Sequence, residues 1–234
     1  MPDDARGAAS VDSRLEAFYE LRANEWPRDD PEAELRFEKA LRAADLVAGE
    51  RLLDLGARGG ALAECARRLG LDIVYAGLDL SEENVRKAAE AGLDVRQADV
   101  SKPLPVEDGA YDCVVCLELL EHLTSPVTLL AEISRVLKPN GRAVLSVPNP
   151  YSWVEIYREL FRRPDTEGHL TGFTTPVMEN LLALAGLRIA TRLGTSIRVP
   201  KTLRLVPTNS IFARSRIYVV RPSDRLVFAG RDLW

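Results

Sequence analysis

The chain has 234 residues, a formal net charge of −4, and apolar and charged fractions of 46% and 28% that are ordinary for a globular protein. This length suits a single domain with a full core, and no apolar run approaches the length of a membrane span. The first ten residues, MPDDARGAAS, lack the basic and apolar regions of a signal peptide, so we expect a cytoplasmic protein.

The sequence contains three cysteines, an odd number that argues against a disulfide framework. Cys113 and Cys116 form a CxxC within the apolar run YDCVVCL, which predicts a strand. Residues three apart on a strand point to opposite faces, so the pair is poorly placed to share a metal or form a disulfide. We expect both side chains to lie in the core.

Helical spacing of apolar residues first appears over 11–24 and 32–47, and Trp26-Pro27 and Pro31 separate the two segments. The pattern predicts two helices ahead of the first strand, which we describe as an N-terminal helical cap over residues 1–50. Such helices either cover a ligand site or pack against the sheet, and the sequence leaves both readings open.

The stretch Arg51–Gly60, RLLDLGARGG, predicts a buried strand and a glycine turn, and a helix follows it. Strand, glycine turn and helix form the first unit of a nucleotide-binding α/β sheet. The dinucleotide pattern G-x-G-x-x-G fails, because Arg58 and Ala61 occupy two of its glycine positions. Asp54 near the strand end would repel a phosphate but suits an ammonium group, which favours S-adenosylmethionine over a dinucleotide.

Acidic residues follow the next three predicted strands, which cover 73–78, 94–98 and 111–117. Asp79 lies about twenty residues after the glycine turn, where a carboxylate suits the hydroxyls of a ribose. Asp99 is placed to accept a hydrogen bond from an exocyclic amine such as that of adenine, and Glu118 ends the fourth strand. Since ligands gather at the carboxyl ends of parallel strands, the four acids predict one site.

Further strands and helices alternate along the rest of the chain: helix 126–137, strand 142–148, helix 151–161, polar loop 162–172, helix 174–186, strands 187–193 and 213–220, and a tail over 221–234. This rhythm predicts an α/β fold with a doubly wound parallel sheet and helices on both faces.

These motifs together resemble the class I S-adenosylmethionine-dependent methyltransferases. DLGARGG resembles their first motif, GLDLS their ribose-binding motif, and QADVSKPLPVEDGAYDCVVCLELLEHL their adenine-binding and following segments. The resemblance covers about residues 45–220. It implies a Rossmann-like sheet of seven strands, with the seventh antiparallel and inserted beside the fifth, and a methyltransferase domain over 51–220.

The resemblance also implies a set of cofactor-binding residues, namely Asp54, Gly56, Ala57, Gly60, Asp79, Leu80, Asp99, Val100 and Glu118. Arg58 departs from the pattern, because the family usually has a second glycine at this position. An arginine with a positive φ would cost on the order of 1 kcal/mol. We expect Gly59 and Gly60 to absorb the turn instead.

The two histidines of the chain, His122 and His169, are our candidates for a general base. Glu118, Glu121 and His122 form ExxEH, which on helical turns would place all three on one face. The segment resembles that of ubiquinone-pathway O-methyltransferases. It also resembles small-RNA 3′-terminal 2′-O-methyltransferases, whose ExxEH joins a downstream histidine to hold a divalent metal. We do not favour a divalent metal as a cofactor, and we assign no metal-binding residues from the sequence.

These observations predict S-adenosylmethionine-dependent O-methylation of a small molecule. Ten Lys and Arg between Leu187 and Trp234, against two acids, suggest an anionic acceptor, and Arg198, Lys201 and Arg204 are the candidates to bind it. The alternatives are a metal-dependent 2′-O-methyltransferase of RNA ends and a non-catalytic nucleotide-binding protein of the same fold. The negative net charge disfavours a nucleic-acid partner.

Overall fold

We describe a computed structural model of the chain, in which residues 17, 18, 20, 30–198, 205–224, 227–228 and 231–232 are described. The helices within these residues are α2 (Pro31–Ala44), α3 (Ala61–Arg68), α4 (Glu82–Glu90), the 3₁₀ turn η1 (Leu120–His122), α5 (Pro126–Val136), α6 (Trp153–Leu160) and α7 (Thr175–Leu184). The strands are β1 (Glu50–Leu55), β2 (Ile73–Asp79), β3 (Val95–Gln97), β4 (Tyr111–Leu117), β5 (Leu137–Pro148), β6 (Leu187–Gly194), β7 (Ser196–Arg198), β8 (Leu205–Pro207), β9 (Ser215–Pro222), β10 (Val227–Phe228) and β11 (Arg231–Asp232).

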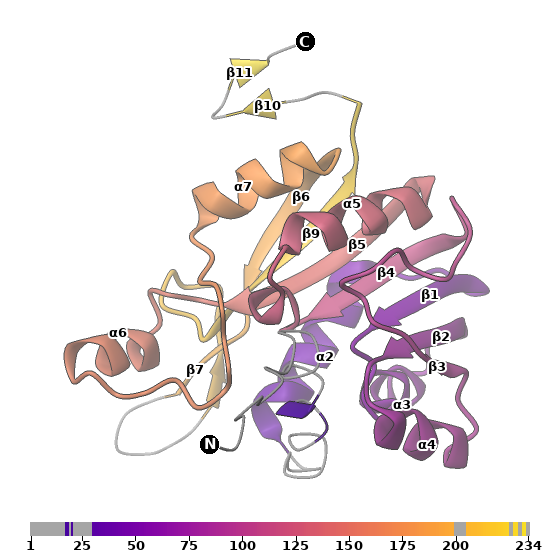
Figure 1. The fold of residues 1–234 in the computed structure, drawn as a ribbon, viewed down its shortest axis with the longest axis horizontal. Coiled ribbons are helices and arrows are strands. Elements are labelled where there is room, and N and C mark those ends of the chain that lie inside the picture. The colour runs from indigo at the N-terminus through magenta and orange to yellow at the C-terminus, as the bar shows by residue number, and fades with distance from the viewer. Residues whose placement is uncertain are drawn as a thin grey trace, which may run out of the picture.

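Seven of these strands form one sheet in the order β3-β2-β1-β4-β5-β9-β6 (Figure 1). Strands β1 to β5 pair in parallel, and β9 runs antiparallel between β5 and β6. The predicted α/β sheet with an antiparallel seventh strand beside the fifth is therefore confirmed. The parallel strands all end at one edge, which is where the predicted site residues fall.

Two apolar clusters cover opposite faces of the sheet. One gathers side chains of α5 and α7, such as Leu129, Ile133 and Met178, and the other gathers those of α2 and α3, such as Leu41 and Leu62. The predicted helices on both faces are thus confirmed. Cys116 lies in the first cluster and Cys113 in the second, both fully buried, so the CxxC residues face opposite sides as expected.

Two predicted boundaries are wrong. Strand β5 begins at Leu137 rather than at 142, because the Lys138 ammonium binds the Asp112 carboxylate on β4 at 2.7 Å and holds this segment to the sheet. Strand β9 continues to Pro222, and β10 pairs with β11 inside the segment predicted as a tail. Most of the predicted helix 11–24 lies outside the described residues, and positions 17, 18 and 20 are helical.

A buried arginine connects α2 to the sheet. Arg142 on β5 donates hydrogen bonds to the carbonyl oxygens of Ala44 and Asp45, at the end of α2, and to the Glu50 carboxylate at the start of β1. The hydrogen bond from Arg142 lowers the pKa of Glu50. Removal of this guanidinium would leave two carbonyls and one carboxylate without their donor.

We expect Arg142→Ala to lower the free energy of unfolding by about 3 kcal/mol, because breaking a buried ion pair strands its partner. Urea denaturation measures this. Arg96→Ala is the matched control, since Arg96 pairs with Asp94 on the exposed surface and its loss should cost less than about 1 kcal/mol. Equal losses in the two variants would contradict the structural role of Arg142.

Candidate active site

The turn after β1 has a left-handed backbone at three positions: Gly56 (φ 73°), Arg58 (φ 50°) and Gly60 (φ 86°). Position 60 has no room for a side chain beside Leu93, since a Cβ there would lie 2.0 Å from Leu93 Cδ1. Gly59 does not have a positive φ, so the expectation that Gly59 and Gly60 relieve Arg58 of the turn is wrong. The backbone at Arg58 adopts the conformation that a glycine would adopt more readily.

The left-handed conformation of Arg58 is accompanied by a backbone hydrogen bond to Asp79. Its backbone N–H donates to Asp79 Oδ2 at 2.6 Å, from the first turn to the end of β2. Asp79 Oδ1 accepts from the Ser81 N–H at 3.0 Å and from Asn84 Nδ2 at 3.1 Å. The carboxylate is buried, which raises its pKa. Three hydrogen bonds thus hold the Asp79 carboxylate in place between β2 and α4.

Asp54 lies one strand away and is also buried. Burial raises its pKa to about 7, and the nearby charge of Asp79 adds to this effect. The Tyr75 hydroxyl donates a hydrogen bond to Asp54 Oδ2 at 2.8 Å and opposes the rise in pKa. A cation placed beside Asp54 would favour the ionised carboxylate.

Other predicted cofactor residues have structural partners of their own. Asp99 lies two residues beyond the end of β3, and its carboxylate accepts from the Ser101 hydroxyl at 2.6 Å and pairs with Lys102 at 2.9 Å. Ala57 and Val100 are buried, and the Leu80 carbonyl accepts from Gln97 Nε2 at 3.1 Å. These positions border the same edge of the sheet as Asp79.

Glu118 adopts a positive φ of 49° directly after β4, and its carboxylate turns toward the ends of two other strands. Oε1 accepts from the Ser146 hydroxyl at 2.7 Å, Oε2 from the Ser215 hydroxyl at 3.0 Å, and Arg36 of α2 lies 3.8 Å from Oε2. Glu118 therefore joins β4, β5, β9 and α2. It does not join Glu121 and His122 in a common ligand set, contrary to the ExxEH prediction, because Glu118 lies before η1 with a left-handed backbone and its carboxylate is bound to Ser146 and Ser215.

Glu121 is 1% exposed, and neither of its carboxylate oxygens has a hydrogen-bond partner among the described residues. Burial raises its pKa well above the usual range, and the charge of Glu118 contributes. The His122 ring lies beside it, with Nε2 4.0 Å from Glu121 Oε1. A buried carboxyl group without partners is costly in a folded protein, and it is a common mark of a functional position.

The loop 162–172 brings His169 to this pair. Its backbone N–H groups at Leu170 and Thr171 donate to the Glu121 carbonyl at 2.7 and 3.2 Å, and the Gly168 carbonyl lies 3.3 Å from His122 Nδ1. The His122 and His169 ring centroids are 5.0 Å apart. Ligand atoms of Glu121, His122 and His169 all lie within 4.8 Å of one another, so the three could hold a metal ion.

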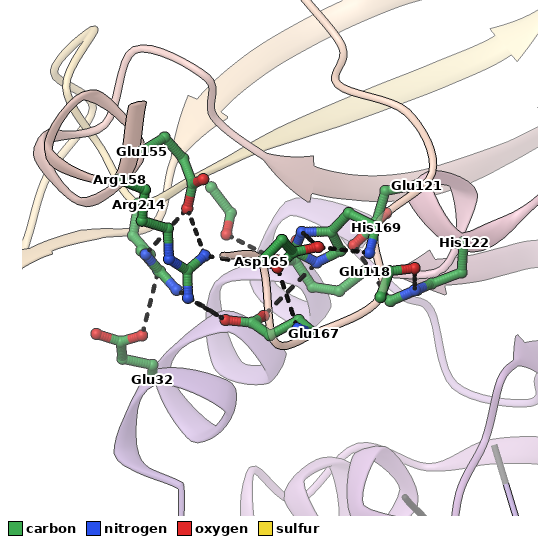
Figure 2. A network of polar contacts seen from close by, with 12 residues as sticks. Glu32, Glu118, Glu121, His122, Glu155, Arg158, Asp165, Glu167, His169 and Arg214 are labelled. Atoms are coloured by element: carbon green, nitrogen blue, oxygen red, sulfur yellow. Dashed lines mark hydrogen bonds and ion pairs between the residues drawn. The ribbon is translucent and has the colours of Figure 1, made fainter. Parts of the chain in front are cut away.

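An ion-pair network fixes this loop to the rest of the domain (Figure 2). Arg214, directly before β9, contacts Glu32 of α2 at 3.6 Å, Glu155 of α6 at 3.4 Å and Glu167 of the loop at 3.4 Å. Arg158 of α6 binds Glu155 at 3.0 Å and Glu167 at 3.1 Å. Burial opposes ionisation of Glu167, but the hydrogen bond from Arg158 and the charge of Arg214 outweigh it and lower its pKa.

The same network surrounds His169 with carboxylates. Asp165 Oδ2 lies 3.5 Å from Nδ1, and Glu167 Oε2 lies 3.6 Å from Nε2. The backbone N–H of His169 also donates to Asp165 Oδ2 at 2.7 Å. Both ring nitrogens therefore face acids on their own loop. Sequence patterns do not predict this network, because Arg214 lies 47 residues from Glu167 and the acids of the loop carry no motif.

Contacts of the described N-terminal residues reach both sides of the site. Glu20 accepts hydrogen bonds from the Ser81 hydroxyl at 3.1 Å and from the Glu82 N–H at 3.0 Å, at the start of α4. The Phe18 ring lies so close to Gly168 that a Cβ there would come within 2.7 Å of it. These contacts join the described N-terminal residues to the start of α4 and to the loop 162–172. Helix α2 itself packs on the sheet.

Several cations expected to receive an anionic acceptor have other partners. Arg192 pairs with Glu179, Arg214 with three glutamates, and Arg216 and Arg221 donate to the carbonyls of Ile211 and Asn140. Lys201, Arg204 and the side chain of Arg198 lie outside the described residues. No helix in the described part of the chain is long and apolar enough to cross a bilayer.

A family model described as a methyltransferase domain matches residues 28–191, more than half of the chain. The chain therefore belongs to the class I S-adenosylmethionine-dependent methyltransferases, and the methyl donor of that family is S-adenosylmethionine. The family resemblance predicted from the motifs is confirmed.

Among similar proteins is a ubiquinone biosynthesis O-methyltransferase of Xanthomonas oryzae pv. oryzae, 34% identical over 148 residues, covering 58% of this chain and 61% of the relative. One from Vibrio campbellii is 33% identical over 158 residues, covering 61% and 65%. The chain thus spans less than two thirds of the length of these relatives.

Two solved structures share the fold. A putative methyltransferase from Haloferax volcanii, in complex with the Trm112 methyltransferase activator, has a TM-score of 0.70 at 21% identity and covers 92% of this chain and 98% of its own. A possible histamine N-methyltransferase from Thermotoga maritima has a TM-score of 0.70 at 17% identity, with coverage of 90% and 100%. At these identities the likeness concerns the fold alone.

The raised pKa of Asp54 predicts a dependence of stability on pH. In the unfolded chain the carboxyl ionises near pH 4, whereas in the folded protein it stays protonated up to about pH 7. The folded state binds the extra proton in this window, so the free energy of unfolding should fall as pH rises from 4 to 7, by on the order of 3–4 kcal/mol. Above pH 7 this contribution should level off.

Asp54→Asn should remove this part of the pH dependence, because the amide cannot ionise but still accepts a hydrogen bond from Tyr75. Urea denaturation at pH 5 and pH 8 measures the difference. Asp94→Asn, at an exposed position, is the control that should keep the wild-type slope. If Asp54→Asn and wild type lose the same stability between these pH values, the buried neutral carboxyl is ruled out.

Proposed function

We propose that the protein transfers a methyl group from S-adenosylmethionine to an oxygen atom of a small-molecule acceptor, with His122 as general base. The observation that carries the proposal is the position of His122. It lies on η1, directly beyond the carboxyl end of β4, and its Nδ1 faces the Gly168 carbonyl. The relatives named as ubiquinone biosynthesis O-methyltransferases support oxygen as the acceptor atom.

The residues at the strand ends suit the bound cofactor. Asp79 would accept a hydrogen bond from a ribose hydroxyl at Oδ2, which accepts one hydrogen bond among the described residues, whereas Oδ1 already accepts two. Asp54 would face the ammonium group, and Asp99 would receive the adenine amine in place of the exposed Lys102. The left-handed turn at Gly56 lets the backbone approach a ligand closely. The cofactor supplies an electrophilic methyl group.

His122 has the properties that removal of a hydroxyl proton requires. With a proton on Nδ1 donated to the Gly168 carbonyl, Nε2 is the unprotonated ring nitrogen. Burial lowers the pKa of His122, and so does the charge of His169, so the ring is neutral near pH 7. As the acceptor oxygen bonds to the methyl carbon, the carbon–sulfur bond breaks with its electrons going to sulfur. The hydroxyl proton passes to His122 Nε2.

The acceptor side of the site is the region between η1 and the loop 162–172, where His169 and the carboxylates of Asp165 and Glu167 lie. An anionic group on the acceptor would have to avoid these carboxylates. Arg198, Lys201 and Arg204 are our proposed contacts for such a group. Substitution of these three by glutamine should then raise the acceptor KM.

Asp79→Ala should weaken S-adenosylmethionine binding by about 10- to 100-fold, because a buried hydroxyl pair loses its acceptor. Calorimetric titration of the full chain measures this. Asp94→Ala, on the exposed surface, is the control and should bind like wild type. NAD, titrated separately, should give no heat. If wild type binds NAD and not S-adenosylmethionine, the cofactor assignment is wrong.

His122→Ala combined with His169→Ala should lower kcat by roughly two powers of ten or more while leaving S-adenosylmethionine affinity unchanged. A panel of phenols, alcohols and amines, assayed for methylated products by mass spectrometry, identifies the acceptor class. Amines need little help from a base, so a preference for them would argue against oxygen. Normal turnover by the double variant would exclude the histidines as bases.

A metal-assisted form of the same reaction is a second candidate. It is favoured by the Glu121 carboxyl group, whose oxygens have no hydrogen-bond partner among the described residues. One carboxylate and two imidazoles would suit a transition-metal ion such as Mn²⁺ or Zn²⁺, which could bind an acceptor oxygen. Treatment with EDTA and dialysis tests this. Loss of activity, restored by Mn²⁺ or Zn²⁺ in wild type but not in Glu121→Gln, would support the metal. Unchanged activity would exclude it.

A further inference from the structure

Helix α6 faces the protein with its polar side. A helix on the surface of a globular domain normally turns its apolar face to the body and its polar face to solvent. In α6 the charged residues Glu155 and Arg158 lie half-buried, as do Val154 and Ile156, whereas the largest apolar side chains of the helix are exposed. Glu155 and Arg158 point toward Arg214 and Glu167 and form the ion pairs of the network (Figure 2). No side chain of α6 is fully buried.

The opposite face of α6 is aromatic and aliphatic. Trp153, Tyr157, Leu160 and Phe161 follow one another at i, i+4, i+7 and i+8, which places them on one side of the helix. Leu160 is 73% exposed and Phe161 61%, and the other two are more than half exposed. The rings of Tyr157 and Phe161 lie 4.7 Å apart. Figure 1 shows α6 projecting away from the sheet.

The apolar surface extends beyond the helix. The Phe212 ring, from the segment before β9, stacks on Trp153 with centroids 5.3 Å apart, and Ile211 beside it is 62% exposed. We call the surface formed by Trp153, Tyr157, Leu160, Phe161, Ile211 and Phe212 the α6 platform. Scattered exposed apolar residues are normal on a protein surface, but a contiguous aromatic group of this kind marks a contact surface.

Positive charge borders the platform. Arg162 and Arg163 follow α6 directly, and both are exposed. Neither guanidinium has an ion pair within the described part of the chain, in contrast to Arg158 and Arg214. Unpaired arginines beside a row of Trp, Tyr, Leu and Phe are the composition of a helix that lies in the interface of a bilayer.

We propose that the α6 platform docks on the surface of a lipid bilayer that contains anionic headgroups. The aromatic and aliphatic side chains enter the interface, and Arg162 and Arg163 bind lipid phosphates. The loop 162–172 follows α6 in the chain, so docking places the proposed acceptor side of the site next to the bilayer. The inference does not depend on which atom the enzyme methylates.

The experiment is co-sedimentation of the full chain with vesicles of phosphatidylcholine alone and of phosphatidylcholine with phosphatidylglycerol. Wild type should bind the anionic vesicles, and Leu160→Glu/Phe161→Glu should lower the partition coefficient at least tenfold. The matched control is Val47→Glu/Leu184→Glu, which changes two residues of similar exposure, 65% and 58%, elsewhere on the surface. It should bind like wild type. Thermal unfolding and S-adenosylmethionine titration should show all variants folded.

Arg162→Gln/Arg163→Gln should weaken binding to anionic vesicles by about fivefold per arginine and leave binding to neutral vesicles unchanged. Equal binding by wild type and this variant would overturn the role of the arginines. Absence of vesicle binding by wild type, or equal binding by Leu160→Glu/Phe161→Glu, would overturn the proposal. So would light scattering that shows a wild-type dimer which Leu160→Glu/Phe161→Glu converts to a monomer, because the platform would then join two copies.

Discussion

The site depends on one constraint, the sharp turn that the chain must make where β1 ends. Three left-handed residues within five positions reverse the chain, and the middle one is an arginine. The same conformation directs the Arg58 N–H at the Asp79 carboxylate, 2.6 Å away. Strain at Arg58 and the position of the Asp79 carboxylate are thus parts of one arrangement. Asp79 in turn receives the Ser81 N–H at the start of α4, so the first two strand–helix units share a single carboxylate.

A second set of carboxylates shapes the acceptor side in a different way. On the cofactor side, backbone N–H groups and a tyrosine hydroxyl satisfy the acids. Around the loop 162–172, the guanidinium groups of Arg158 and Arg214 neutralise the carboxylates of Glu155 and Glu167. Backbone N–H groups of the same loop donate hydrogen bonds to η1 and attach the loop to it. Glu121 belongs to neither set. Its carboxyl group is buried beside two histidines and accepts no hydrogen bond from the residues that the structure describes, so a ligand or an ion there would change the local electrostatics strongly.

Sequence patterns predicted the sheet and the strand-end acids well, because strand, turn and cap signals are local. The alternation of strands and helices predicted the parallel strands, whereas the antiparallel strand beside β5 was predicted from the family resemblance alone. Asp54 and Asp79 are buried in β1 and β2, where the motifs placed them. Contacts between distant segments could not be predicted in this way. Glu118 turns to Ser146 and Ser215 instead of Glu121, and Arg214 finds carboxylates on three other elements. Such pairings depend on how the loops cross the edge of the sheet, and the residues of one segment alone do not predict that path.

The central position of β9 has a consequence for how the protein is made. Its residues are the last to join the seven-stranded sheet, yet β9 lies between β5 and β6 rather than at an edge. A ribosome-bound chain ending before residue 214 would therefore carry an open gap in its sheet. In that chain Glu118 would lack its partner Ser215, and Glu167 would lack its partner Arg214. The nucleotide-binding half can fold as it emerges. The acceptor side can be completed only after β9 has left the ribosome.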